Sequence, residues 1–205
     1  MDPLTVLTAF VVVLPVELPD KTFVATLVLS TRYPGRLVWL GVAAAFLVQV
    51  AIAVTAGSLL SLLPRGPVLV GAALLFAVGC AVLLRGAASA DEDAAEEERE
   101  VAARDTGSVQ GLRAAGASFL VLFAAEWGDL SQLFTAGLAA RTGDPLAVGL
   151  GAWLALASVA ALAVLLGRAL LRRVRLATVR RLGALVCAVL AVVTAVEAAQ
   201  ELGVG

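Results

Sequence analysis

Long apolar stretches alternate with shorter polar ones along the 205-residue chain. A helix of about 20 apolar residues crosses a bilayer core of roughly 30 Å, so each long stretch is a candidate membrane span. The pattern predicts six spans, separated by short loops and one long polar segment. Their approximate ranges are 4–30, 37–62, 67–84, 113–140, 146–167 and 182–203.

Composition favours the same class of protein. The chain is 61% hydrophobic and 15% charged, whereas soluble domains average about 45–50% apolar and about 25% charged residues. We therefore predict an all-α integral membrane protein with six transmembrane helices.

The distribution of arginines predicts the orientation of the spans. The loops after the first, third and fifth spans carry twelve arginines, and the other loops carry two, Arg65 and Arg141. Lys21 is left out of this comparison because it lies within the first span. Since basic residues concentrate in cytoplasmic loops, both termini are expected outside the cytoplasm. The abundance of Arg, Ala, Val and Gly is typical of a GC-rich bacterium, so we expect the bacterial cytoplasmic (inner) membrane.

Missing residue types exclude several functions. The chain has no histidine, and its two cysteines, Cys80 and Cys187, lie in apolar stretches. Histidine-based zinc sites and Ser-His-Asp chemistry are thereby excluded, and no other nucleophile–base arrangement is visible, so no enzyme is expected. Basic residues without interleaved aromatics argue against nucleic-acid binding. The expected partners are the lipid bilayer and small ions, and a homodimer is compatible with the sequence.

The two halves of the chain, 1–85 and 113–205, resemble each other. Each half contains three predicted spans, an odd number, so the second half is expected to be inverted in the membrane relative to the first. Inverted repeats are typical of secondary transporters, whose sites lie near the membrane midplane. Residues 86–112 join the halves, and their acidic stretch at 91–100 predicts a solvated cytoplasmic linker.

Four acidic residues lie in apolar surroundings at matched positions. At an offset of 109 residues, Glu17 matches Glu126 and Asp20 matches Asp129. A charge near the bilayer centre costs at least about 2.5–3.5 kcal/mol on insertion scales, so these carboxylates need a compensating reason. A bound ligand is one explanation, and pairing with Lys21 or capping of a broken helix is the alternative. A spacing of three places each pair on one helix face, and a two-fold axis between the halves brings both pairs to one cavity. Hard divalent cations take such oxygen ligands, and protons compete for the same oxygens.

Neighbouring residues suit a cation site of this kind. Thr22 and Ser131 offer hydroxyl groups, and Gln132 offers an amide oxygen. Lys21 is interpreted as an internal counter-charge to Asp20, with a position at the membrane interface as the alternative.

Other polar and aromatic residues of the spans receive structural interpretations. Gln49 is expected to hydrogen-bond a neighbouring helix, and Trp127 is expected to shape the wall of the cavity. Glu197 and Glu201 are four residues apart near the outer end of the sixth span. An interfacial position is predicted for both, with a role in the exit path as the alternative.

The two acidic clusters resemble a known motif. The sequence is similar to the Golgi-type calcium/manganese–proton antiporters and their bacterial relatives, small six-span proteins with two copies of E-x-G-D-[KR]-[ST]. The copies here read Glu17-Leu18-Pro19-Asp20-Lys21-Thr22 and Glu126-Trp127-Gly128-Asp129-Leu130-Ser131. The resemblance implies that the four carboxylates are metal and proton ligands, with the two hydroxyl residues as supporting ligands. Three positions depart from the family pattern: Pro19, Leu130 and Phe23.

These observations predict a secondary transporter that exports Mn²⁺ or Ca²⁺ from the cytoplasm in exchange for protons. The ion is the substrate, and no cofactor is expected. One alternative is a proton-coupled exporter of a small organic solute, as in the lysine-exporter superfamily. A second is a membrane assembly factor without transport activity, which would keep its function when Asp20 or Asp129 is neutralised.

Overall fold

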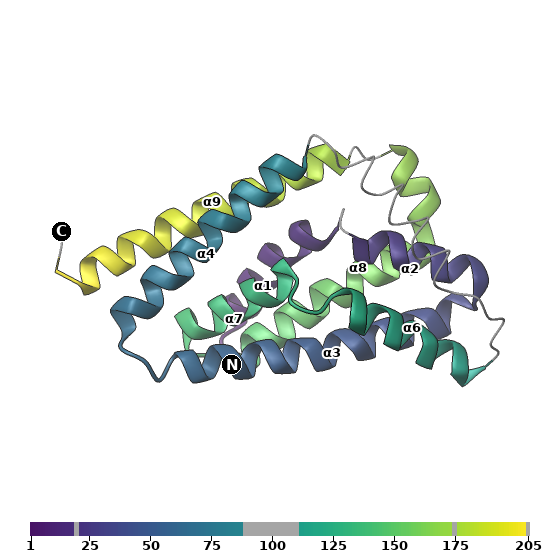
Figure 1. Ribbon diagram of the computed structural model, residues 1–205, viewed down its shortest axis with the longest axis horizontal. Coiled ribbons are helices and arrows are strands. Elements are labelled where there is room, and N and C mark those ends of the chain that lie inside the picture. Colours follow the sequence, from purple (N-terminus) through teal and green to yellow (C-terminus); the bar gives the residue numbers. More distant parts are fainter. Residues whose placement is uncertain (19–20, 88–110, 174–175, 204–205) are drawn as a thin grey trace.

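All regular structure in the described part of the chain is helical, which confirms the predicted all-α membrane protein (Figure 1). The computed structural model describes residues 1–18, 21–87, 111–173 and 176–203, and within them the side chains of 21, 166–173, 176–177 and 179 are left out. The predicted acidic stretch of the linker, at 91–100, therefore lies outside the described residues. The helices are α1 (Pro3–Glu17), α2 (Lys21–Arg32), α3 (Gly35–Leu60), α4 (Arg65–Gly86), α6 (Leu112–Ala125), α7 (Leu130–Thr142), α8 (Pro145–Arg173) and α9 (Leu176–Glu201).

Four of these helices, α3, α4, α8 and α9, are long and apolar enough to cross a membrane. They correspond to the second, third, fifth and sixth predicted spans. The first predicted span is two helices, α1 and α2, bent by 73°. The fourth predicted span, 113–140, is also two helices: α6 has 14 residues, α7 has 13, and a non-helical turn that contains Gly128 separates them. The count of six spans stays a prediction.

The helices α8 and α9 extend beyond the predicted spans. The helix α8 runs on to Arg173 and α9 begins at Leu176, so most of the segment interpreted as an arginine-rich loop is helical. Residues 168–182 contain no proline or glycine, and Arg, Leu and Ala are all good helix formers. The local sequence therefore contains no residue that would end α8 at Arg168 or delay the start of α9 until after Arg181.

Helices of the first half pack mainly against helices of the second half. The pairs with the most extensive contact are α4 with α9, α1 with α8, and α3 with α8 and α6. Gly41 of α3 lies against α6 so closely that a Cβ atom would overlap the carbonyl oxygen of Ala115. Gly151 of α8 lies against α1 in the same way, at the carbonyl oxygen of Val6. Val6 and Ala115 occupy matching positions of the two halves, as do the two glycines.

Polar contacts define the two ends of the bundle. At one end, the backbone N–H of Asp2 donates to the Asp144 carboxylate at the start of α8, at 3.0 Å. Asp2 also caps α1, because its carboxylate accepts from the backbone N–H groups of Leu4 and Thr5 at 3.2 Å each. At the opposite end, the Arg180 guanidinium of α9 donates to the carbonyl of Gly86 in α4. The helices α4 and α9 are therefore antiparallel neighbours along one edge of the molecule (Figure 1).

Candidate metal centre

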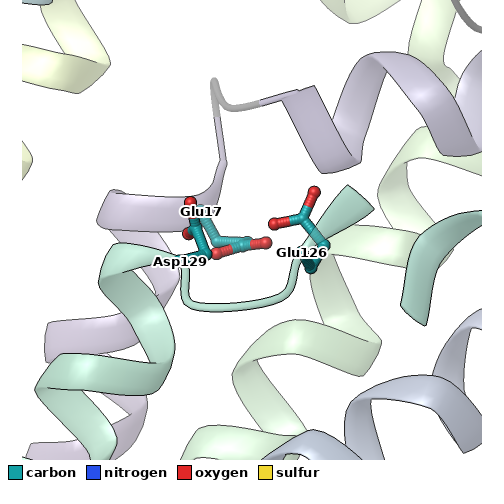
Figure 2. A group of neighbouring side chains, drawn as sticks. All are labelled: Glu17, Glu126 and Asp129. Atoms are coloured by element: carbon teal, nitrogen blue, oxygen red, sulfur yellow. The ribbon is translucent and has the colours of Figure 1, made fainter. Parts of the chain in front are cut away.

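Three carboxylates gather where helices end inside the bundle. Glu17 is the last residue of α1, Glu126 caps the C-terminus of α6, and Asp129 caps the N-terminus of α7. One oxygen from each lies within 4.8 Å of the others, and Figure 2 shows the three side chains turned toward one another. Glu17 and Glu126 are buried, at 0% and 2% exposure, and Asp129 is half-buried.

The turn between α6 and α7 presents two of these carboxylates. Gly128 has a φ of +80°, a left-handed conformation that glycine adopts without steric cost. The Gln132 side chain spans the turn: its Nε2 donates to the Glu126 carbonyl at 3.0 Å, and its Oε1 accepts from the Gly128 N–H at 3.2 Å. Both ends of this amide therefore hold the turn in this conformation. The predicted role of Gln132 as a metal ligand stays a prediction.

The helix ends add to the negative charge of the cluster. The helices α1 and α6 end there, and the C-terminal carbonyls of a helix carry partial negative charge. The N-terminus of α7 offsets part of it, since the Asp129 carboxylate accepts from the Ser131 N–H at 3.4 Å. Carboxylates this close are stable together only when a cation or bound protons balance their charge. A donor set made only of oxygen atoms suits a hard divalent cation.

The structure describes three of the four predicted carboxylates and brings these three together. The fourth, Asp20, and the side chain of its predicted counter-charge Lys21 lie outside the described residues. Ser131 is buried beside Asp129, and Thr22 is buried at the start of α2. Within the described part of the chain, the Thr22 hydroxyl has no hydrogen-bond partner.

Two other predicted residues have mixed outcomes. The expected interhelical hydrogen bond of Gln49 is confirmed, because its Nε2 donates to the Phe123 carbonyl of α6 at 3.2 Å. Trp127 does not form the wall of a closed cavity. It is 63% exposed and packs edge-on against Phe123, with ring centroids 5.2 Å apart. The indole therefore lies on the surface of the bundle.

One ion pair was missed by the sequence analysis. The Arg141 guanidinium of α7 makes two hydrogen bonds to the Glu197 carboxylate of α9, at 3.0 and 2.7 Å. The two residues are 56 positions apart, and no motif links them. Only the placement of α7 near the C-terminal end of α9 reveals the pair.

The fold and the carboxylate cluster together define a multi-pass α-helical membrane protein with an acidic centre at interrupted helices inside the bundle. The model of the divalent cation/proton antiporter GDT1 family matches residues 5–91 and 114–202 of the chain. The chain belongs to this family of transporters, which confirms the resemblance seen in the two motifs.

Individual relatives agree with the family match. A GDT1-like protein of Synechocystis sp. is 32% identical over 200 residues, which cover 93% of this chain and 97% of that protein. The chloroplastic GDT1-like protein 1 of Oryza sativa, subspecies indica and japonica, is 33% identical over 183 residues, or 80% of this chain and 53% of the rice protein. No solved structure matches the chain.

Proposed function

We propose that the protein exports Mn²⁺ or Ca²⁺ from the cytoplasm in exchange for protons, using the carboxylates of Glu17, Asp20, Glu126 and Asp129. The observation that carries this proposal is the approach of three carboxylates, from helix breaks in both halves, to within 4.8 Å of one another. Cation/proton exchange is the activity of the family, and the choice of ion and the direction of export are the proposed refinements.

The geometry supports a competition between the cation and protons. When a divalent cation binds between Glu17, Glu126 and Asp129, its charge balances the carboxylates, and protons leave their oxygens. When the cation leaves, the same carboxylates repel one another and take up protons again. If the site opens to one side of the membrane at a time, each cation that leaves is replaced by protons from that side. The hydroxyls of Thr22 and Ser131 are proposed as further oxygen ligands.

The matched glycine contacts support the proposed inverted repeat of residues 1–85 and 113–205. Gly41 against Ala115 and Gly151 against Val6 are the same contact with the two halves exchanged. A two-fold axis in the membrane plane produces this exchange and relates α1 to α6 and α2 to α7. With this axis, the excess of arginine in the loops of one side supports termini outside the cytoplasm.

The experiment uses purified protein in liposomes with a proton gradient and a trapped metal-sensitive dye. Mn²⁺ and Ca²⁺ are offered separately to the wild type, to Glu126→Gln and to Asp129→Asn. The control is Glu201→Gln, the same change at an exposed position of α9. We expect metal uptake in the wild type and the control, and its loss in the two site variants and after the gradient is dissipated.

Other outcomes would overturn this function. If folded wild-type protein moves neither ion, metal exchange is refuted, and proton-driven uptake of lysine or a similar solute then identifies an organic-solute exporter. If Asp129→Asn moves metal at the wild-type rate, the carboxylate cluster is not the transport site. A membrane assembly factor would show no uptake of either kind.

A further inference from the structure

A polar cavity of about 340 Å³ lies at the end of the bundle that contains the N-terminus. We call it the terminal vestibule. The helices α1, α4, α7 and α9 all contribute to its lining. Its polar and charged lining includes Asp2, Thr5, Thr8, Arg65, Arg141 and Glu197. The carboxylate cluster uses none of these residues, so the vestibule is a second polar feature of the molecule.

Two of the three helices that carry the carboxylates, α1 and α7, also line the terminal vestibule. Thr8 lines the vestibule and lies nine residues before Glu17 on α1, and Leu138 lines it and lies nine residues after Asp129. Nine residues of α-helix span about 14 Å, so both helices lead from the vestibule to the cluster over the same length. The helices α1 and α7 contact each other along this path. The vestibule is therefore aligned with the carboxylates.

Apolar packing separates the vestibule from the cluster in this conformation. Ala9, Val12 and Val16 of α1 belong to one buried apolar cluster with Phe134 and Leu138 of α7. A hydrated cation cannot cross closely packed apolar side chains. Passage toward this end of the bundle therefore requires α1 and α7 to move apart.

The ion pair of Arg141 and Glu197 opposes such a movement because it joins α7 to α9, and α9 also packs against α1. It ties the last turn of α7 to α9 through two hydrogen bonds, and its side chains are 15% and 39% exposed. Arg65 also lines the vestibule, so two guanidinium groups face the space. The carboxylate of Asp2 is already engaged in capping α1. A cation that leaves through the vestibule would be repelled by these two guanidinium groups. Glu197 is the acidic residue that can offset this repulsion.

We propose that the terminal vestibule is the route between the carboxylate cluster and the outside, and that the Arg141–Glu197 ion pair is its gate. The inference rests on the proposed cation exchange. While the pair is formed, α7 is held against α9 and the route is closed. When α7 moves away, the pair separates, and the released Glu197 carboxylate faces the cation that passes Arg141 and Arg65.

Cysteine labelling tests the gate without any transport measurement. The background is Cys80→Ala/Cys187→Ala in the full chain in liposomes, and Val12→Cys places one thiol in the buried apolar packing between the vestibule and the carboxylate cluster. A membrane-impermeant thiol reagent is applied to the side of the membrane on which the N-terminus lies. Glu197→Gln or Arg141→Gln removes the ion pair and is expected to raise the labelling rate about two- to fivefold. This is the increase in the population of the open state expected when a partly exposed ion pair is lost. Glu201→Gln, one turn further along α9, is expected to leave the rate unchanged.

Charge exchange provides a second control. The variant Arg141→Glu/Glu197→Arg restores opposite charges and is expected to return the labelling rate toward that of the wild type. If wild type and both single variants label equally, the gate is refuted. If labelling requires the reagent on the cytoplasmic side, the route does not lead outside and the proposal is equally refuted.

Transport kinetics test the route separately. Glu197→Gln leaves two arginines without an acidic partner in the vestibule, so the KM for metal taken up from this side is expected to rise. Arg141→Gln leaves a free carboxylate, so the same KM is expected to fall or stay unchanged. If both variants move KM in the same direction, the cation route is refuted. If the wild type exchanges no metal, the proposed function fails, while the labelling results still decide whether the ion pair controls access.

Discussion

Replacing Gly41 by alanine tests the packing between the two halves. A Cβ atom at Gly41 would overlap the backbone carbonyl of Ala115, and one at Gly151 would overlap that of Val6. A backbone carbonyl in a helix cannot turn aside, so each helix pair must separate. The matched controls are Gly71 in α4 and Gly116 in α6, where a Cβ atom would meet nothing within 4 Å.

The expected magnitude follows from two opposing effects. Alanine in place of glycine favours the helix by about 1 kcal/mol at all four positions. Overpacking costs about 1–3 kcal/mol and applies to Gly41 and Gly151 only. The propensity gain is common to all variants, so Gly41→Ala and Gly151→Ala should be about 1–3 kcal/mol less stable than the control variants. For a chain of this length, this corresponds to roughly 3–9 °C in the midpoint of thermal unfolding.

The assay is thermal unfolding of the four purified variants in one detergent, followed by circular dichroism at equal protein concentration. The two packed glycines should lower the midpoint relative to both controls and by similar amounts, because they make the same contact in opposite halves. If Gly41→Ala unfolds at the midpoint of Gly71→Ala, the close approach of α3 to α6 is refuted. If Gly41→Ala and Gly151→Ala differ widely, the equivalence of the two halves is refuted.

Three further predictions concern single side chains. Gln132→Glu keeps an acceptor oxygen but removes the N–H that holds the Glu126 carbonyl, so the affinity for Mn²⁺ should fall about tenfold in a metal titration; unchanged affinity would instead favour Gln132 as a ligand. Gln49→Leu removes a hydrogen bond between α3 and α6, and unfolding in detergent should show a loss of about 0.6 kcal/mol. The N–H groups of Ala147 and Asp2 and the N-terminal ammonium lower the pKa of Asp144, so its contribution to stability is complete above pH about 4 and is lost as the pH falls through the lowered value. The difference in unfolding midpoint between wild type and Asp144→Asn should therefore be present at pH 7 and should shrink at pH 3; a constant difference would contradict this assignment.

The carboxylate cluster could be predicted because a buried charge has few physical explanations. Glu17, Glu126 and Asp129 occur in apolar stretches at matched positions, and an ionised side chain there requires a ligand or partner. The amide of Gln49 followed the same reasoning, and the expected interhelical bond is present. The sequence shows both that these polar residues lie within membrane-spanning stretches and which functional groups they carry. These predictions therefore did not depend on how the helices pack.

Features that depend on how helices approach one another could not be predicted. Arg141 and Glu197 become partners only when α7 and α9 are placed in space. The exposure of Trp127 depends on how the turn between α6 and α7 lies against the neighbouring helices, which the sequence alone does not determine. The extension of α8 to Arg173 was missed because charge was interpreted as a loop, although the local residues favour helix.

The arrangement of helix contacts has a consequence for biosynthesis. The most extensive contacts of α1, α3 and α4 are all made with helices of the second half. When the ribosome has completed only residues 1–85, the surfaces of α3 around Gly41 and of α4 have no partner in the chain made so far. The helices of the first half must therefore remain inserted in the lipid bilayer but incompletely packed until the second half has been synthesised and inserted. A nascent chain arrested in the linker should accordingly be more sensitive to membrane proteases than the completed protein.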